Sequence, residues 1–297
     1  MKKISIILVN YNGNLDTLDC IKSIKKSDYE NYNIIVVDNE SKMQNYIALS
    51  NDLLHQQDVI LIRSDKNLGF AGGNNIGIKY ALYKLKSEYV LLLNNDTVIK
   101  EDTLSELVKA AEKFKDSGII GGKIYYYLER NKIWYAGGYI NWRRFTTFNK
   151  GIGEIDTGQY DEIQETEFIT GCTMLIKSEV IEKVGYLPEE YFMYYEDTDY
   201  NIQAIYAGYK LYYTPKAVIY HKVSSSTGGE ESSFSIEYGT RNRRYFMKKF
   251  KNKVNVISYL YSVAFFYLTR LIKIIIYSLK REKEKRKAMF RWLHKYI

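Results

Sequence analysis

The chain has 297 residues, which is enough for one large domain with an appendage. Hydrophobic residues make up 46% of the sequence and charged residues 26%, a balance that is typical of folded domains and excludes an intrinsically disordered chain. The only two cysteines, Cys20 and Cys172, exclude a disulfide framework, and no Cys/His spacing matches a zinc site.

Charge is unevenly distributed along the chain. Residues 241–297 contain 17 Lys and Arg against 2 Asp and Glu, whereas residues 1–240 carry a net charge of −7. A strongly basic tail behind a mildly acidic body indicates an anionic partner surface, either a membrane or a nucleic acid.

The first 125 residues predict an open α/β sheet. Apolar runs and amphipathic helical stretches alternate there, with runs at 4–9, 34–38, 59–62 and 90–93 and helices at 15–26, 42–54 and 74–86. Runs rich in Ile and Val are typical of a mostly parallel sheet with helices on both faces. The first run is too short for a signal peptide and precedes no cleavage pattern, so we predict a cytoplasmic protein.

Over residues 118–177 the sequence pattern is typical of short strands separated by glycines. A helix is predicted from Ser178, a second over 198–207 that ends before Gly208, and short strands over 209–213 and 217–221. We therefore predict one domain over residues 1–240 and a helical tail over 241–297.

Polar residues follow each apolar run of the first half. They are Asn10, Tyr11 and Asn12 after Val9, then Asp38, Arg63, and finally Asn94, Asn95 and Asp96. Because the ligands of open α/β sheets lie outside the carboxyl ends of the strands, this edge is predicted to bind a large polar ligand.

Each of these features also has a purely structural interpretation. Asp96 could hold a divalent cation or simply form a turn, and Asp38 could accept a ribose hydrogen bond or form an Asx turn. The segment 69–75, Gly-Phe-Ala-Gly-Gly-Asn-Asn, would let backbone approach a phosphate, although its spacing is neither GxGxxG nor a P-loop.

Two further features lie in the second half. Glu196, Asp197 and Asp199 stand at a predicted helix N-terminus, where they suit the helix dipole and where crowding would also suit a general base. His221 closes an apolar run and precedes Lys222 and the serines at 224–226, and it is either structural or a ligand.

Taken together, these motifs resemble the family 2 glycosyltransferases of GT-A fold, especially the rhamnosyltransferase-like members. The matching stretches occur in the family's order and cover roughly residues 4–245; they are 7–12, 36–41, 67–74, 93–96, 171–176, 192–199 and 221–226. The resemblance implies a GT-A catalytic domain with a nucleotide-binding half over about 1–125 and an acceptor half over about 126–240.

The resemblance also implies a nucleotide-diphosphate sugar donor, dTDP-rhamnose or a UDP-sugar. The implied donor contacts are Val9, Asn10, Tyr11, Asn12, Asp38, Arg63, Asn67, Gly69, Gly72, Asn74, Asn95 and Asp96. Asn94 replaces the first acidic residue of the family's Asp-x-Asp motif. Mg²⁺ or Mn²⁺ would therefore be held by Asp96 with His221 as the second ligand.

For catalysis, the resemblance implies that Asp197 is the base, with Glu196 as the alternative. The acceptor hydroxyl would attack the anomeric carbon in a single displacement that inverts its configuration, in the synthesis of a cell-surface polysaccharide. The residues expected near the acceptor are Trp134, Gly171, Cys172 and Asp199, although Asp199 also suits a structural role and core packing explains Trp134 equally well.

The tail predicts membrane association. Its uninterrupted apolar part, residues 254–269, is short for a membrane span, and a basic cluster follows at 280–287. We expect a helix lying on the inner face of the cell membrane as a peripheral contact, near a glycan or lipid-linked acceptor. The alternatives are packing on the catalytic domain or on a second copy in a homodimer. No nucleic-acid partner is expected, because the body is acidic.

Two other functions remain open from the sequence. A sugar-1-phosphate nucleotidyltransferase has a similar sheet but needs a basic, glycine-rich loop after the first strand, where this chain has 10–14, Asn-Tyr-Asn-Gly-Asn. A non-catalytic, membrane-bound sugar-binding scaffold would not need Asp38, Asp96, Asp197 and His221 together.

Overall fold

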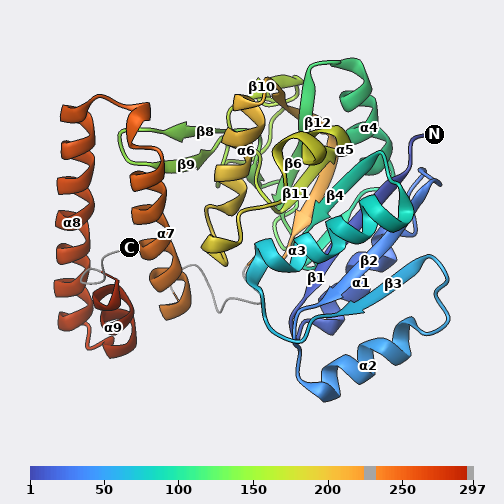
Figure 1. Cartoon of the computed structure of the whole chain (residues 1–297), viewed down its shortest axis with the longest axis horizontal. Helices are drawn as coiled ribbons and strands as arrows, with labels where there is room; N and C mark the ends of the chain where they lie inside the picture. Colours follow the sequence, from blue (N-terminus) through green and yellow to red (C-terminus); the bar gives the residue numbers. More distant parts are fainter. Residues whose placement is uncertain (224–231, 293–297) are drawn as a thin grey trace.

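A computed structural model describes residues 1–223 and 232–292, so the predicted serines at 224–226 lie outside the described residues. The centre of the fold is a ten-stranded sheet. Eight of its strands follow the order β10-β12-β6-β11-β4-β1-β2-β3, while β5 pairs with β12 and β7 pairs with β6 (Figure 1). Its first four strands along the chain are parallel to one another; they are β1 (Ile4–Asn10), β2 (Tyr32–Asp38), β3 (Val59–Arg63) and β4 (Tyr89–Leu93). The predicted α/β fold is confirmed.

The helices between these strands follow the predicted order. They are α1 (Asn14–Ile24), α2 (Met43–Leu53) and α3 (Gly69–Tyr80), which continues as a π-helical segment (Ala81–Leu85). Helix α3 begins five residues before the predicted start, because the Asn39 side chain accepts the Leu68 N–H and donates to the Gly69 carbonyl oxygen. Helix α4 (Thr103–Lys113) was not predicted.

The second half extends the same sheet with mixed directions. Strand β11 (Thr173–Lys177) is antiparallel to β4 and β6 (Ser117–Tyr126), and β12 (Lys210–His221) is parallel to β6. The shorter strands are β5 (Thr97–Ile99), β7 (Ile133–Tyr135), β10 (Gln164–Thr166) and the hairpin β8 (Gly138–Asn141) with β9 (Thr146–Asn149).

The prediction of two strands at 209–213 and 217–221 is wrong, since both belong to β12. The register of β12 against β6 shifts between Thr214 and Val218, a stretch that contains Pro215. Proline has no N–H for the ladder, so an irregularity accommodates it within one continuous strand.

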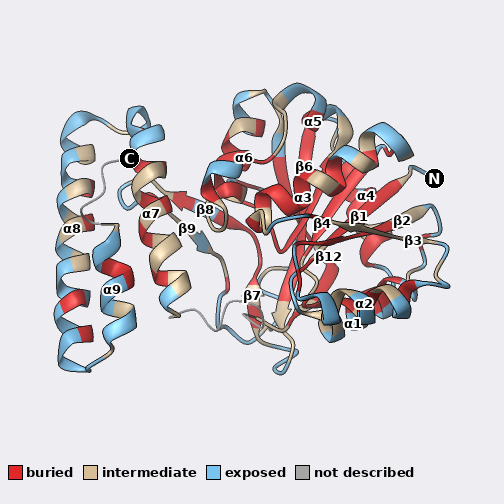
Figure 2. Ribbon diagram, turned by 60° about the horizontal axis from the view of Figure 1, so that its bottom comes forward, coloured by how far each residue is buried: buried red, intermediate tan, exposed pale blue. Residues whose placement is uncertain are grey.

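Hydrophobic clusters cover both faces of the sheet. Alternating residues of β1 show this, because Ile6 packs in the cluster with α1 and α4 while Ile7 packs in the cluster with α3, α5 (Ser178–Val184) and α6 (Glu196–Tyr206). The strands are accordingly buried along most of their length (Figure 2).

The C-terminal region is helical, as predicted for the tail. It contains α7 (Ser233–Lys249), α8 (Val256–Leu279) and α9 (Lys283–Arg291), with 3-10 turns at Glu189–Tyr191 before α6 and at Lys251–Lys253 before α8. The expected boundary at residue 240 falls inside α7. Helix α8 alone among the described helices is long and apolar enough to cross a membrane by length and composition, and much of its surface is exposed (Figure 2).

Candidate active site

A cavity of about 1240 Å³ opens at the carboxyl ends of β1 and β4. It is lined by the N-terminal half, the second half and the C-terminal helices. Of the residues predicted for the site, those that line it are Val9, Tyr11, Asn67, Gly69, Asn74, Asn95, Asp96, Trp134, Gly171, Cys172, Glu196, Asp197 and His221. The sheet edge thus brings together the predicted donor, metal and base residues.

The other predicted residues do not line this cavity; they are Asn10, Asn12, Asp38, Arg63, Gly72 and Asp199. Gly72 has a packing role, because a Cβ there would lie 2.6 Å from the Leu68 Cβ. Asp199 is fully buried and accepts hydrogen bonds from the Tyr191 hydroxyl, 2.7 Å, and Lys249 Nζ, 2.6 Å. These contacts tie α6 to α7 and indicate a structural role.

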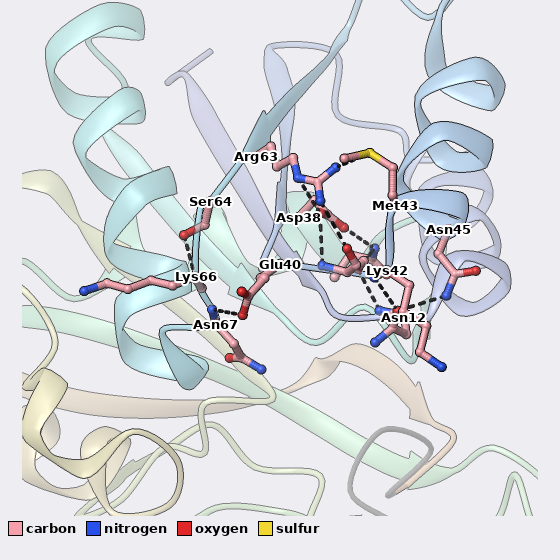
Figure 3. Close-up of polar contacts among 12 residues, drawn as sticks. Asn12, Asp38, Glu40, Lys42, Met43, Asn45, Arg63, Ser64, Lys66 and Asn67 are labelled. Atoms are coloured by element: carbon pink, nitrogen blue, oxygen red, sulfur yellow. Dashed lines mark hydrogen bonds and ion pairs between the residues drawn. The ribbon is translucent and has the colours of Figure 1, made fainter.

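The Asp38 carboxylate organises the loops at the ends of β1 and β2 (Figure 3). Its Oδ1 accepts from Asn10 Nδ2 at 3.0 Å, its Oδ2 accepts from the Ser41 N–H at 3.3 Å, and Arg63 Nε lies 4.0 Å away. Asn12 has a left-handed backbone, with φ 58°, and its N–H donates to Ser41 Oγ. Asp38 therefore shapes this edge through protein contacts.

Asn39 holds the loop that precedes α3. Its Nδ2 donates to Asn67 Oδ1 and to the Gly69 carbonyl oxygen, both at 3.0 Å, and the Gly69 N–H donates to Asn67 Oδ1 at 2.9 Å. Asn39 also lines the cavity, and it was not predicted as a site residue although it lies within the matching stretch 36–41. The donor loop is thus tied to the end of β2.

Asp96 and His221 form a buried pair at the cavity wall. His221 Nε2 lies 3.2 Å from Asp96 Oδ1, and the Trp134 ring meets the imidazole edge-on with centroids 4.8 Å apart. Burial opposes the imidazolium, but Cys172 and Asp96 outweigh it and raise the pKa of His221 to about 10. A cation bound here would displace that proton, because only the neutral imidazole is a metal ligand.

The donor set of this pair fits a divalent cation. A carboxylate oxygen and an imidazole nitrogen that already face each other are suitable ligands for Mn²⁺, and the carboxylate for Mg²⁺. Within residues 1–223 and 232–292, no group of three or more His, Cys, Asp or Glu side chains is positioned to hold a metal. The remaining ligands would therefore come from a bound phosphate or from water, as is common for Mg²⁺.

Glu196 and Asp197 begin α6 and have different surroundings. Asp197 Oδ2 accepts from the Gly171 N–H at 2.9 Å and Oδ1 from the Thr198 N–H at 2.7 Å, whereas Glu196 Oε2 is buried without a hydrogen-bond partner in the described structure. Burial, with the charge of Asp197, raises the pKa of Glu196 to about 8. Burial also raises the pKa of Asp197, but its backbone donors favour the charged form. Asp197 therefore ionises more readily than Glu196.

The C-terminal helices supply cavity residues that were not predicted. Arg243 of α7 and Arg270 and Lys273 of α8 line it, together with Arg144 from the β8–β9 hairpin. No local sequence pattern signals this, because it arises from the folding of the tail back onto the domain.

Comparison with known protein families shows to which family the chain belongs. The family model for glycosyl transferase family 2 matches residues 5–185. The chain belongs to this family. The matched segment contains β1 to β4, the Asp96 turn and the Gly171 loop of the glycosyltransferase, and ends before Glu196 and Asp197.

Relatives of this glycosyltransferase are similar over most of its length. The low-salt glycan biosynthesis hexosyltransferase Agl10 of Haloferax volcanii is 30% identical over 81% of the chain and 74% of its own length. The rhamnosyltransferase WbbL of Escherichia coli is 26% identical over 77% of the chain and 86% of its own length.

Solved structures support the GT-A fold. The mannosyltransferase PcManGT of Pyrobaculum calidifontis, solved with GDP-Man and Mn²⁺, matches with a TM-score of 0.61 at 14% identity, over 97% of the chain and 84% of that protein. Three further solved structures of this fold are longer, and the chain spans 47%, 39% and 65% of them.

Proposed function

We propose that this glycosyltransferase moves a hexose from a nucleotide-diphosphate donor to an acceptor hydroxyl, with inversion at the anomeric carbon and with a divalent cation. The observation that carries the proposal is that Asp96 and His221 line the same cavity as Asp197. Ligands for a diphosphate-bound cation and a candidate general base thus face one space.

The donor nucleotide is assigned to the side of the cavity formed by β1, β2 and α3. Tyr11, Asn67 and Asn74 present a ring and amides to this space, while Asp38 and Arg63 fix the loops behind them. The expected donor is dTDP-rhamnose or a UDP-sugar. The names of the rhamnosyltransferase WbbL and the hexosyltransferase Agl10 support a hexose of this kind as the transferred sugar, and PcManGT, solved with GDP-Man, makes a GDP-sugar a third choice.

Asp197 is proposed as the general base. Its two oxygens are fixed by the backbone N–H groups of Gly171 and Thr198, which favour the charged form of the carboxylate and hold it in one orientation. It would take the proton of the acceptor hydroxyl as that oxygen attacks the anomeric carbon. A cation bound by Asp96 and His221 would neutralise the charge of the departing diphosphate.

The acceptor is assigned to the cavity wall around Trp134, Gly171 and Cys172. Trp134 offers an aromatic face of the kind that packs on sugar rings, and its indole N–H is buried without a hydrogen-bond partner in the described structure. The acceptor class that fits is a glycan, free or lipid-linked, in the synthesis of a surface polysaccharide, and the name of Agl10 supports a role in glycan synthesis.

The outer face of α8 is proposed to lie on a membrane surface. Its exposed apolar residues are Val256, Ile257, Leu260, Tyr261, Leu268, Leu271, Ile272, Ile275, Ile276 and Leu279. The opposite face packs on the protein through Phe266 and Ile274 and directs Arg270 to the cavity, which suits a helix lying in the interface better than one spanning the bilayer.

Ligand-induced stabilisation tests the proposed function. The melting temperature is measured with UDP, dTDP and GDP, each with Mn²⁺ and with EDTA, because a ligand that binds only the native state raises it. We expect one nucleotide to stabilise the wild type in a metal-dependent manner and to lose this effect in Asp96→Asn. Absence of any shift with well-folded protein would contradict the donor site.

A further inference from the structure

The tail side of the cavity carries uncompensated positive charge. Arg144, Arg243, Arg270 and Lys273 all line it. Among the described residues, none of these four side chains makes an ion pair with a carboxylate within 4.0 Å, although other tail cations such as Lys249 do. Clustered cations without carboxylate partners in a cavity indicate an anionic ligand.

Arg243 gives the strongest indication. Its residue is 8% exposed, and its Nε donates to the Arg144 carbonyl oxygen at 2.8 Å. Its Nη2 is buried without a hydrogen-bond partner in the part of the chain that the structure describes, and so is Nε of Arg270. Buried charged donors are rarely left unpaired, because they have lost their hydration without replacement.

Both guanidinium groups are held in place by one aromatic ring. Arg270 lies 4.0 Å and Arg243 5.5 Å from the centroid of Phe266. Burial and the charge of Arg243 lower the pKa of Arg270 to about 10, so both groups remain charged at neutral pH. Two oriented guanidinium groups match the oxygens of a phosphate, which they bind in a bidentate manner.

We infer that this part of the cavity is an anion subsite in which Arg243 and Arg270 hold a phosphate or diphosphate group of the acceptor, an inference that rests on the proposed function. Helices α7 and α8 lie at the opposite end of the molecule from β3 and α2 (Figure 1). Arg270 belongs to α8, whose outer face carries the exposed apolar residues, so the helix that is proposed to contact a membrane also supplies the subsite, which suits a phosphate attached to a lipid.

Titration with inorganic pyrophosphate in EDTA tests the subsite in the full chain. Arg270→Gln should weaken binding at least tenfold. Lys273→Gln should weaken it about threefold, and this exposed position guards against a folding defect in the first variant. Lys251→Gln changes an exposed tail lysine outside the cavity and should bind like the wild type. Equal binding by all four proteins, or no binding to the wild type, would overturn the inference.

A second titration distinguishes a phosphate of the acceptor from the diphosphate of the donor nucleotide. UDP, dTDP and GDP are titrated with Mn²⁺ into the wild type and Arg270→Gln. Nucleotide affinity should be equal within twofold, since the subsite serves the acceptor. A loss of nucleotide affinity as large as the loss for pyrophosphate would assign the arginines to the donor and overturn the inference. If no nucleotide binds the wild type, the proposed function fails, while the pyrophosphate titration still decides the subsite.

Discussion

Gly69 and Phe192 connect the two halves of the cavity through a close contact between their backbones. Gly69 has φ +69°, and a Cβ built on it would lie 2.0 Å from the Phe192 carbonyl oxygen. The same carbonyl oxygen accepts the Phe70 N–H at 2.7 Å. The start of α3 and the segment before α6 therefore pack backbone to backbone, and only glycine permits it.

Gly69→Ala is accordingly expected to destabilise the protein by at least about 2 kcal/mol, because it combines a left-handed backbone with a steric overlap. Chemical denaturation measures the change. Gly153→Ala is the matched control, since Gly153 also has positive φ but a Cβ at this position would meet no atom within 4 Å. The control should lose only about 1 kcal/mol. Equal losses would show that the contact with Phe192 is unimportant.

Glu196 should make stability depend on pH. Its pKa is raised to about 8 by burial and by Asp197, whereas the unfolded side chain ionises near 4.5. Between these values the unfolded state releases a proton that the folded state keeps, so the free energy of unfolding falls as pH rises, by up to about 1.4 kcal/mol per pH unit. Glu196→Gln removes this dependence. The difference in free energy of unfolding between Glu196→Gln and the wild type should shift in favour of the variant by roughly 2 kcal/mol from about pH 5.5 to about pH 7.5. A difference that does not change with pH would contradict a protonated Glu196.

Asp197→Asn should lower kcat by about 10²- to 10⁴-fold, the usual contribution of a general base, with nucleotide affinity nearly unchanged. Asp199→Asn is the control on the same helix. It breaks the buried contact with Lys249 and should cost about 3 kcal/mol of stability while kcat of the folded enzyme is retained. Transfer by Asp197→Asn at the wild-type rate would exclude Asp197 as the base.

Asn94→Asp should tighten cation binding. Asn94 lines the cavity beside Asp96. The proposed cation site has a single carboxylate, and the variant would add a second negative charge there. We expect Mn²⁺ to bind at least about fivefold more tightly in calorimetric titration with nucleotide present. Asp96→Asn should have the opposite effect. Unchanged affinity in both variants would place the cation elsewhere.

The part of the site that could be predicted from the sequence is the part formed by the ends of the parallel strands. Apolar runs located β1, β2 and β4, so the polar residues that follow them, such as Asn95 and Asp96, could be assigned to a common cavity. Strand ends are local features, and the geometry of parallel sheets brings them together without any knowledge of long-range contacts.

Residues whose position depends on tertiary packing were not predictable in this way. Asp199 and Asp197 share a helix turn and the same favourable dipole, yet only Asp197 lines the cavity. Residues two apart point to different faces of a helix, and the fold sets the face of Asp199 against α7, where Lys249 pairs with it. Arg243 and Arg270 were assigned to a separate tail. Their contribution follows from helix packing between segments distant in the sequence, for which the tail has no local signal.

Asn242 of α7 holds the segment that carries the proposed base. Its Nδ2 donates to the carbonyl oxygens of Tyr191 at 2.8 Å, Met193 at 2.7 Å and Tyr194 at 3.0 Å. Phe192, Tyr194 and Tyr195 all have positive φ, a backbone that persists only where surrounding contacts impose it. Asn242→Ala should therefore lower stability by about 2 kcal/mol and reduce kcat at least tenfold, because α6 begins directly after this segment.

Asn255→Ala is the control that separates a loss of stability from a loss of kcat. Asn255 caps α8 by accepting the Ser258 N–H at 2.9 Å, and its loss should cost about 1 kcal/mol. It lies outside the cavity, so kcat measured well below the melting temperature should match that of the wild type. If Asn242→Ala lost stability but kept its kcat, the segment before α6 would hold its shape without Asn242, and α7 would serve only to stabilise the fold.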